Sequence, residues 1–308
     1  MNKTIIHVGL HKTATTFLQL NVWPQISGYT YLSRPYTQHN HSFNQLQYAD
    51  DSLYDKNLVL RELNRIDANR LLISDESFSG KPLYFSYLNR SIIAKRLKDL
   101  FPKAEIILFL RDQKDIILSH YSGYTLMPYG IKQIKDLFYR PGPDYTYDNY
   151  LDKPHQYQMS SLYYNTNDYF IHLDCFLYSN LVSLYNDLFD KCHVFLYEDF
   201  EKDFQESIAR LEEIVGEHIG VKSMKRENVS LSPTQIEKQR KANCVPPISN
   251  KYLRKLVQVA IRIASNAQDK DFKTIAHEIA GGYYSQDNQV LKRMLPSLGW
   301  DKHPDKYT

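Results

Sequence analysis

A lysine and three threonines near the start of the chain have side chains suited to holding an anion. Directly after an expected strand at 5–8 come Lys12, Thr13, Thr15 and Thr16, and a helix is expected to begin near Thr15. The first N–H groups of a helix have no carbonyl partner within it, and the helix dipole is positive at that end. The turn therefore predicts a site for a phosphate-like anion.

This turn does not follow the pattern of the ordinary P-loop. That pattern is G-x-x-x-x-G-K-[ST], whereas His11 precedes Lys12 here and Gly9 is the only glycine nearby. The sequence thus indicates a phosphate-binding protein of another kind than the common ATPases.

A second group suited to an anion follows another expected strand. The apolar strand at 105–110 ends at Leu110, Arg111 stands at its tip, and a helix is expected to start near Asp112. Ser119 lies eight residues after Arg111, about two helical turns on, so both side chains could face one anion. The planar fork of an arginine suits a terminal phosphate dianion, and a serine hydroxyl adds a donor.

Together these two segments resemble the nucleotide motifs of the sulfotransferases that use 3′-phosphoadenosine 5′-phosphosulfate (PAPS). The family's first motif is roughly K-[ST]-G-T-[TS]-aromatic, and residues 12–17 match it with Ala14 in place of glycine. The second is roughly R-[ND]-x-x-D-x-x-x-S-x-Y, which residues 111–121 match. A supporting Y-E-[DE]-[LMF] motif corresponds to residues 197–200, so the resemblance covers about residues 4–216.

The resemblance implies how PAPS would be bound. The 5′-phosphosulfate would lie on the first motif, and Arg111 and Ser119 would hold the 3′-phosphate. Phe17 would pack on the adenine or would be the first core residue of its helix, and both interpretations stay open. The implied cofactor-binding residues are His11, Lys12, Thr13, Ala14, Thr15, Thr16, Phe17, Arg111 and Ser119.

Two side chains are the candidates for catalysis. Lys12 would stabilise the charge that builds on the leaving phosphate, and Glu76 would take the proton of an acceptor hydroxyl. Asp75 and Glu76 follow the strand at 70–74, and strand alternation sends them to opposite faces, so only one of them would face the sulfur. Asp75 and the histidines at 11, 41 and 120 remain alternative bases, and Glu76 could instead cap the next helix.

Alternating strands and helices predict an α/β fold of three layers, with a mostly parallel sheet between helices and a P-loop-like binding loop. Ligands bind at the carboxyl ends of such strands, where Lys12, Arg111 and Glu198 are expected. Glu198 is expected to support the fold. We expect one domain over 1–308, with the core in 1–216 and a polar loop and helical tail in 217–308. The expected strands are 5–8, 70–74, 105–110 and 193–197, and the expected helices are 58–69, 91–100, 177–190 and 203–215.

Composition sets the wider expectations. The net charge of +3 allows an anionic cofactor without indicating nucleic acid. Three widely spaced cysteines match neither a zinc site nor a disulfide framework, and no apolar run approaches the ~20 residues that span a bilayer. With no signal peptide at the N-terminus, a cytoplasmic protein is expected. No metal is expected, and the oligomeric state stays open.

The predicted function is transfer of the sulfuryl group of PAPS to an acceptor hydroxyl, leaving adenosine 3′,5′-bisphosphate. A saccharide acceptor is favoured because residues 128–168 are rich in tyrosine and the R-K-G-x-x-G loop of small-molecule enzymes is missing. The family usually closes over the nucleotide with a late basic loop, and the candidates for this role here are Arg226, Asn228 and Ser230. The alternatives are a lipid or small-molecule alcohol as acceptor, a P-loop nucleotide kinase, and a nucleotide-binding module without turnover.

Overall fold

The computed structural model describes residues 3–82, 87, 89–125, 137–139, 171–224, 231–243, 250–264 and 272–298. The chain divides into two compact units. The first comprises residues 1–112, 176–228 and 284–308, and the second comprises residues 113–175 and 229–283. The tyrosine-rich stretch 128–168 lies almost entirely outside the described residues, as do Arg226, Asn228, Ser230 and Cys244.

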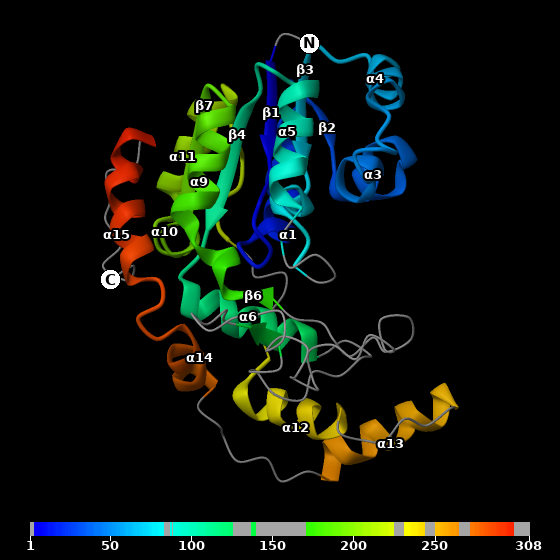
Figure 1. The fold of residues 1–308 in the computed structure, drawn as a ribbon, viewed down its shortest axis with the longest axis vertical. Coiled ribbons are helices and arrows are strands. Elements are labelled where there is room, and N and C mark those ends of the chain that lie inside the picture. Colours follow the sequence, from blue (N-terminus) through cyan, green and yellow to red (C-terminus); the bar gives the residue numbers. More distant parts are fainter. Residues whose placement is uncertain are drawn as a thin grey trace. The chain divides into compact units, whose positions relative to one another are not determined.

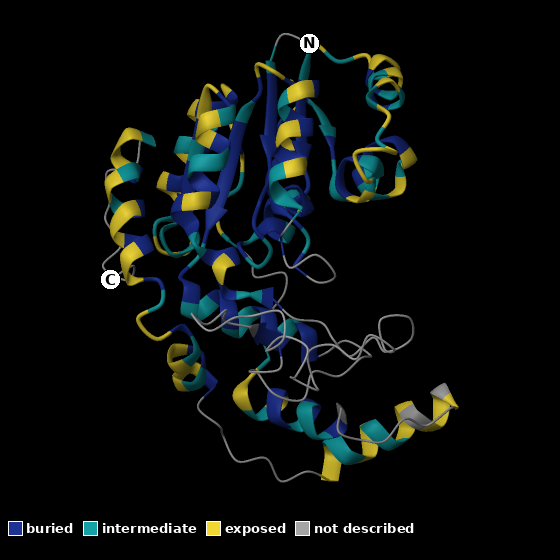
Figure 2. Ribbon diagram, in the orientation of Figure 1, coloured by how far each residue is buried: buried dark blue, intermediate teal, exposed yellow. Residues whose placement is uncertain are grey.

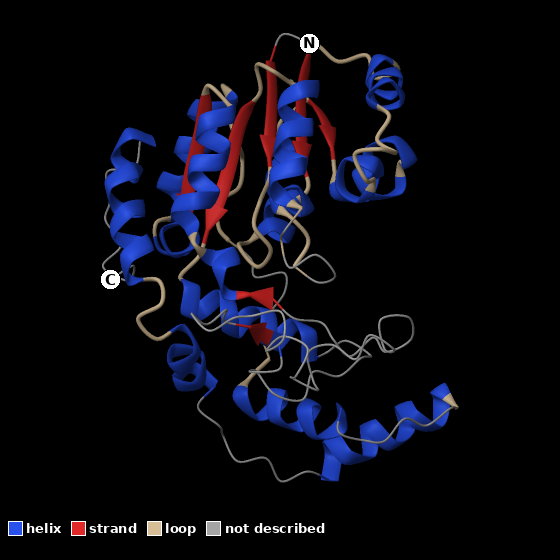
Figure 3. Ribbon diagram, in the orientation of Figure 1, coloured by secondary structure: helices blue, strands red, loops and turns tan. Residues whose placement is uncertain are grey.

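A five-stranded sheet forms the centre of the first unit, and all of its neighbouring strands are parallel (Figures 1 and 3). The strand order is β2-β3-β1-β4-β7. The strands are β1 (Lys3–His7), β2 (Thr30–Leu32), β3 (Arg70–Ser74), β4 (Glu105–Leu110) and β7 (Lys191–Leu196). This parallel sheet between helices confirms the predicted fold class.

Four of these strands were predicted, and two of them have the predicted bounds. The sequence pattern missed β2, an edge strand of three residues that is too short to show a period of two. The strand predicted at 193–197 begins two residues earlier, and Tyr197 belongs instead to helix α10 (Tyr197–Lys202). Two acidic residues in the first turn of α10, Glu198 and Asp199, favour this helix start through the helix dipole.

Helices connect the strands of the first unit. The helical run after the first turn starts at Thr15, as predicted, and continues as α1 (Thr15–Phe17), η1 (Leu18–Val22) and η2 (Trp23–Gln25). The helix expected at 58–69 ends at Asn64. The others are α2 (Arg34–His39), α3 (His41–Tyr48), α4 (Lys56–Asn64), η3 (Glu76–Ser79), α5 (Arg90–Leu100), η4 (Leu173–Phe176, which ends in this unit), α9 (Tyr178–Leu188), α11 (Phe204–Val215), α15 (Ser285–Met294) and η5 (Leu295–Leu298).

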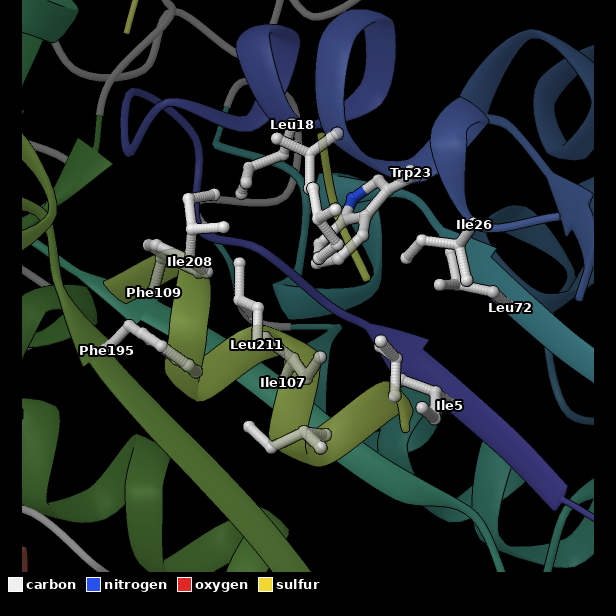
Figure 4. Close-up of a cluster of buried hydrophobic side chains, with 14 of the residues drawn as sticks. Ile5, Leu18, Trp23, Ile26, Leu72, Ile107, Phe109, Phe195, Ile208 and Leu211 are labelled. Atoms are coloured by element: carbon white, nitrogen blue, oxygen red, sulfur yellow. The ribbon is translucent and has the colours of Figure 1, made fainter. Parts of the chain in front are cut away.

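One face of the sheet carries a large apolar cluster (Figure 4). Ile5, Ile107 and Phe109 of the central strands meet α11 there, whose Ile208 and Leu211 are almost fully buried. Phe109 stacks on the ring of Phe195 from β7, with centroids 4.8 Å apart. Alternation along the strands places these residues on one face. The same cluster includes Leu18 and Trp23, so it holds β1, β4 and β7 against the helical run that begins at Thr15.

The opposite face is covered by α5 and α9, which pack side by side. The strand residues of alternate parity, Ile6, Leu108 and Val194, are fully buried. The C-terminal helix α15 packs on α9, and the Asp287 carboxylate accepts the backbone N–H of Tyr178 at 2.7 Å. The helical tail predicted from the sequence thus supplies the cap for the first turn of α9.

The second unit is mainly helical. It contains α6 (Gln113–Thr125), α12 (Pro233–Asn243), α13 (Lys251–Ala264) and α14 (Phe272–Ala280), with a two-stranded sheet of β5 (Phe138–Tyr139) and β6 (Ile171–His172). Tyr121 of α6 packs on Phe272 of α14, with ring centroids 5.6 Å apart. None of the described helices is long and apolar enough to cross a lipid bilayer.

His7 at the end of β1 is fully buried, so a positive charge on its ring is disfavoured. Its Nδ1 accepts the Trp23 N–H at 3.3 Å and lies 2.7 Å from the Ser74 hydroxyl. Burial lowers the pKa of His7 from 6.5 to about 3. Between these values the unfolded chain takes up a proton that the folded chain does not, so folding weakens as the pH falls below 6.5.

We predict that His7 costs the fold about 2 kcal/mol at pH 5 relative to neutral pH. His7→Asn keeps an acceptor near the Nδ1 position and does not titrate, so its free energy of unfolding should fall less steeply on acidification. Urea unfolding at several pH values measures this difference. The exposed His41→Asn variant is the control and should keep the wild-type slope. Equal slopes for His7→Asn and wild type would contradict the prediction.

Candidate functional site

Charged residues gather where the parallel strands of the first unit end. Lys12 follows β1, Glu76 follows β3, Arg111 follows β4, and Glu198 follows β7. Since these strands are parallel neighbours in the sheet, their carboxyl ends share one edge, as predicted. Together these residues define the candidate site.

The turn from Gly9 to Ala14 is tightly packed against the residue that follows β3. Gly9 has φ +60°, and a Cβ placed on it would lie 2.9 Å from Cβ of Glu76 and 2.9 Å from Cγ2 of Thr15. Only glycine fits both the backbone angle and the space. The side chain of Thr13 is fully buried, and its hydroxyl donates to the Leu10 carbonyl at 2.6 Å. The turn is thus held in one shape by its own residues.

Ala14 adopts the conformation for which glycine is preferred. Its φ of 62° and ψ of 14° are left-handed, directly before the helical run that starts at Thr15. Lys12 also has a positive φ, 72°. Left-handed backbone costs a residue with a Cβ about 1 kcal/mol or more. The turn therefore keeps a strained backbone at Lys12 and Ala14, and strain of this kind is common at ligand sites.

The Lys12 ammonium lies among charges of both signs. Burial lowers its pKa, and the charges of Arg111 and Arg34 lower it further, while Glu76 opposes the shift. An ammonium whose proton is held less tightly is a stronger hydrogen-bond donor to a group that gains negative charge. The environment of Lys12 therefore suits the role predicted for it.

Arg111 is held in place through its main chain and its guanidinium. Its Nη1 donates to the Lys12 carbonyl at 3.0 Å, and the guanidinium lies 4.5 Å from the centroid of the Tyr197 ring. Its own carbonyl accepts the Tyr178 hydroxyl at 2.7 Å. The Glu198 carboxylate accepts the N–H of Asp112, the next residue, at 3.0 Å. Glu198 thus supports the backbone beside Arg111, in line with the fold-supporting role expected for it.

The two carboxylates after β3 have different surroundings. Asp75 is fully buried, caps the N–H of Ser77 at 2.8 Å, and accepts Thr37 at 2.6 Å and Gln47 at 2.7 Å. Glu76 instead accepts the Gln19 amide at 2.8 Å and forms an ion pair with Arg34. Asp75 is therefore the helix cap and Glu76 the carboxylate beside Lys12, so the capping alternative raised for Glu76 applies to its neighbour.

Glu76 is almost completely buried, at 3% exposed. Burial raises the pKa of its carboxyl, the charge of Asp75 raises it further, and the Arg34 guanidinium acts against both. A carboxylate held in this way is a stronger base than one in water. These surroundings suit proton abstraction from a neutral hydroxyl.

Arg34 is a site residue that the sequence pattern did not reveal. It opens α2, its Nε lies 3.9 Å from Asp75, and its side chain is 35% exposed. The only signal was the S-R-P start of a helix, which says nothing about an ion pair with Glu76, 42 residues away. Gln19, two residues past the phosphate motif, was missed for the same reason.

Phe17 and Ser119 are two further residues of the predicted nucleotide site. Phe17 is 3% exposed and packs edge-on against Phe200 and Phe204, which fits the interpretation as a core residue. Ser119 lies on α6 in the second unit, so its sharing of an anion with Arg111 stays a prediction.

The histidines kept as alternative bases are spread through the chain. The rings of His11 and Tyr87 pack edge to face, with centroids 5.9 Å apart, and His41 is exposed at the start of α3. His120 is buried in the second unit, with its ring stacked on Tyr124. Among the described residues, no group of three or more histidine, cysteine, aspartate or glutamate side chains could hold a metal ion.

Two solved structures are similar to the chain. One is a sulfotransferase from Alicyclobacillus acidocaldarius, with 14% sequence identity and a TM-score of 0.47 over 98% of this chain and 96% of that one. The other is the mouse sulfotransferase SULT7A1 complexed with PAP, with 13% identity and a TM-score of 0.36 over 95% of this chain and 89% of that one. No protein-family model and no curated protein matches the sequence.

The strain at Ala14 leads to a prediction about stability. Ala14→Gly should raise the free energy of unfolding by about 1 kcal/mol, because glycine adopts the left-handed backbone without a Cβ penalty. Gly9→Ala, the matched change in the same turn, should lower it by about 3 kcal/mol, because the new Cβ collides with Glu76 and Thr15. Urea unfolding measures both. A stabilising Gly9→Ala or a destabilising Ala14→Gly would show that the turn has another shape.

Proposed function

We propose that the protein is a sulfotransferase that moves the sulfuryl group of PAPS to an acceptor hydroxyl. The observation that supports this most is the pairing of two cations at one sheet edge. Lys12 stands in a turn before a helix start, and Arg111 from the neighbouring strand donates to the carbonyl of Lys12. This donor set fits a nucleotide that carries anionic groups at two separate positions.

The chemistry proposed for these residues needs no bound metal. As the acceptor oxygen forms its bond to sulfur, the bond between sulfur and the 5′-phosphate oxygen breaks, and the electron pair stays on that phosphate. Lys12 and the N–H groups of the turn would stabilise the charge that the phosphate gains. Glu76 would take the proton of the hydroxyl. The products are a sulfate ester and adenosine 3′,5′-bisphosphate.

The surroundings of Thr13 favour this proposal over a P-loop kinase. In a P-loop kinase the hydroxyl that follows the lysine and a nearby carboxylate hold Mg²⁺, whereas the Thr13 hydroxyl is fully buried and donates to the Leu10 carbonyl. The charge of Glu76 also acts on Lys12. A nucleotide-binding module without turnover would have no use for a carboxylate with a raised pKa there.

We propose a saccharide hydroxyl as the acceptor. The tyrosine-rich composition of 128–168 supports this choice, since aromatic rings stack on sugar faces. A lipid or small-molecule alcohol is the second candidate. A panel of acceptors with sulfur-labelled PAPS distinguishes these classes.

Nucleotide preference tests the proposal. Adenosine 3′,5′-bisphosphate at a hundredfold excess over its Kd should stabilise the protein by about 2.7 kcal/mol, measured as a rise in Tm. ATP with Mg²⁺ should give a smaller rise. Equal or greater stabilisation by ATP with Mg²⁺ would overturn the proposal in favour of a kinase.

Replacement of Lys12 separates binding from transfer. Lys12→Ala should lower kcat for sulfuryl transfer by at least about 100-fold, because one donor to the leaving phosphate is lost. It should keep measurable binding of adenosine 3′,5′-bisphosphate through Arg111. The matched control is Lys56→Ala on the exposed surface of α4, which should leave kcat unchanged. Unchanged turnover in Lys12→Ala would contradict the role given to it.

The raised pKa of Glu76 predicts the pH dependence of transfer. The base acts only when ionised, so kcat should rise with pH, with a midpoint above the usual value for a glutamate. Glu76→Gln should lower kcat by about 100-fold or more and remove this rise, while binding of adenosine 3′,5′-bisphosphate persists. Asp75→Asn is the contrast, and it should chiefly lower stability because Asp75 is the buried cap. A pH profile that survives in Glu76→Gln would exclude Glu76 as the base.

A further inference from the structure

Helix α13 exposes a continuous row of large apolar side chains. The row comprises Tyr252, Leu253, Leu256, Val259 and Ile263, which are 70%, 50%, 66%, 36% and 78% exposed. We call this set the α13 stripe. Spacings of three and four residues place its members on one side of the helix. Figure 2 shows exposed residues recurring along the length of α13.

The exposure is unusual when compared with another amphipathic helix of the same chain. In α11 the apolar residues have the same helical spacing, and Ile208, Leu211 and Val215 are at most 3% exposed. The opposite side of α13 is partly covered. Val257 and Ile261 are half-buried there, and α13 packs on α12. Arg262 donates to Gln239 of α12 at 3.2 Å. The helix thus has one packed side and one open apolar side.

The charge on α13 and in the segment before it is mostly positive. Residues 250–264 contain four lysines and arginines and no acidic residue. The wider segment 222–264 contains ten basic residues and two glutamates, while the whole chain has a net charge of +3. The rest of the chain is therefore net negative. Lys255, which is exposed, lies directly beside Leu256 of the stripe.

We propose that α13 is a docking surface for an anionic lipid membrane. The stripe would enter the boundary between headgroups and acyl chains, while lysines such as Lys255 contact lipid phosphates. A helix of fourteen residues is about 21 Å long, enough to lie in the membrane plane but too short to span it. The inference rests on the second unit and does not depend on the proposed sulfuryl transfer.

The charge favours this occupant over a second copy of the chain. Two copies joined face to face through the stripe would bring two wholly basic helices together, and their like charges would repel. An anionic membrane both removes the apolar side chains from water and neutralises the lysines and arginines. Each basic residue near such a surface contributes about 1 kcal/mol of attraction.

Sedimentation with vesicles tests the proposal on the full chain. Vesicles of phosphatidylcholine with about one third phosphatidylserine should bind the protein at least about tenfold more tightly than pure phosphatidylcholine, and about 0.5 M salt should weaken this binding strongly. Leu256→Glu with Ile263→Glu should lower the affinity at least about tenfold, because both side chains would have to enter the membrane. Both positions are exposed, and circular dichroism checks that the variant is folded.

Two controls test whether the effect belongs to the stripe. Leu53→Glu alters an equally exposed leucine of the first unit and should bind vesicles like the wild type. Lys255→Glu should weaken binding by more than Lys56→Glu, the same change on α4. Failure of the wild type to bind anionic vesicles, or unchanged binding by the double variant, would overturn the proposal. A dimer that the double variant dissociates, with vesicle binding unchanged, would show that a second copy covers the stripe.

Discussion

The close approach of Gly9 to Glu76 is the constraint on which the candidate site depends. Without a side chain at Gly9, the turn after β1 rests directly on the residue that follows β3. That contact brings the lysine of the turn within the field of a buried carboxylate, although the two are 64 positions apart in the chain. The parallel pairing of β1 with β3 sets this approach, because it fixes where both strands end.

The remaining charges at this edge balance one another. Burial raises the pKa of Glu76, and the charge of Arg34 acts against this shift. Burial lowers the pKa of Lys12, and the charges of Arg111 and Arg34 lower it further. Arg111 ties its own strand to the turn through the Lys12 carbonyl, and Glu198 supports the backbone beside Arg111. A half-buried lysine and a buried carboxylate can coexist here because each of them lies in the field of an opposite charge.

Much of this arrangement was predictable from the sequence, since it depends on strand ends. The apolar runs that became β3 and β4 have sharp limits, so Glu76 and Arg111 could be placed at one edge from the parallel topology alone. The positions of Arg34 and Gln19 could not be predicted, because tertiary packing brings them to Glu76 and no local sequence pattern records such a contact. Edge strand β2 was missed because three residues are too few to show alternation. Helix α10 was missed because it begins directly after β7, and its first residue, Tyr197, was assigned to that strand. The left-handed backbone of Ala14 contradicts local preference, and the turn imposes it.

The central claim is that this edge binds a nucleotide with separate 5′- and 3′-phosphates. A crystal structure with adenosine 3′,5′-bisphosphate tests it most directly. The account predicts the 5′-phosphate on the turn of Lys12–Thr16 and the 3′-phosphate within hydrogen-bond distance of Arg111. A nucleotide bound elsewhere, or bound with its 3′-phosphate away from Arg111, would contradict it.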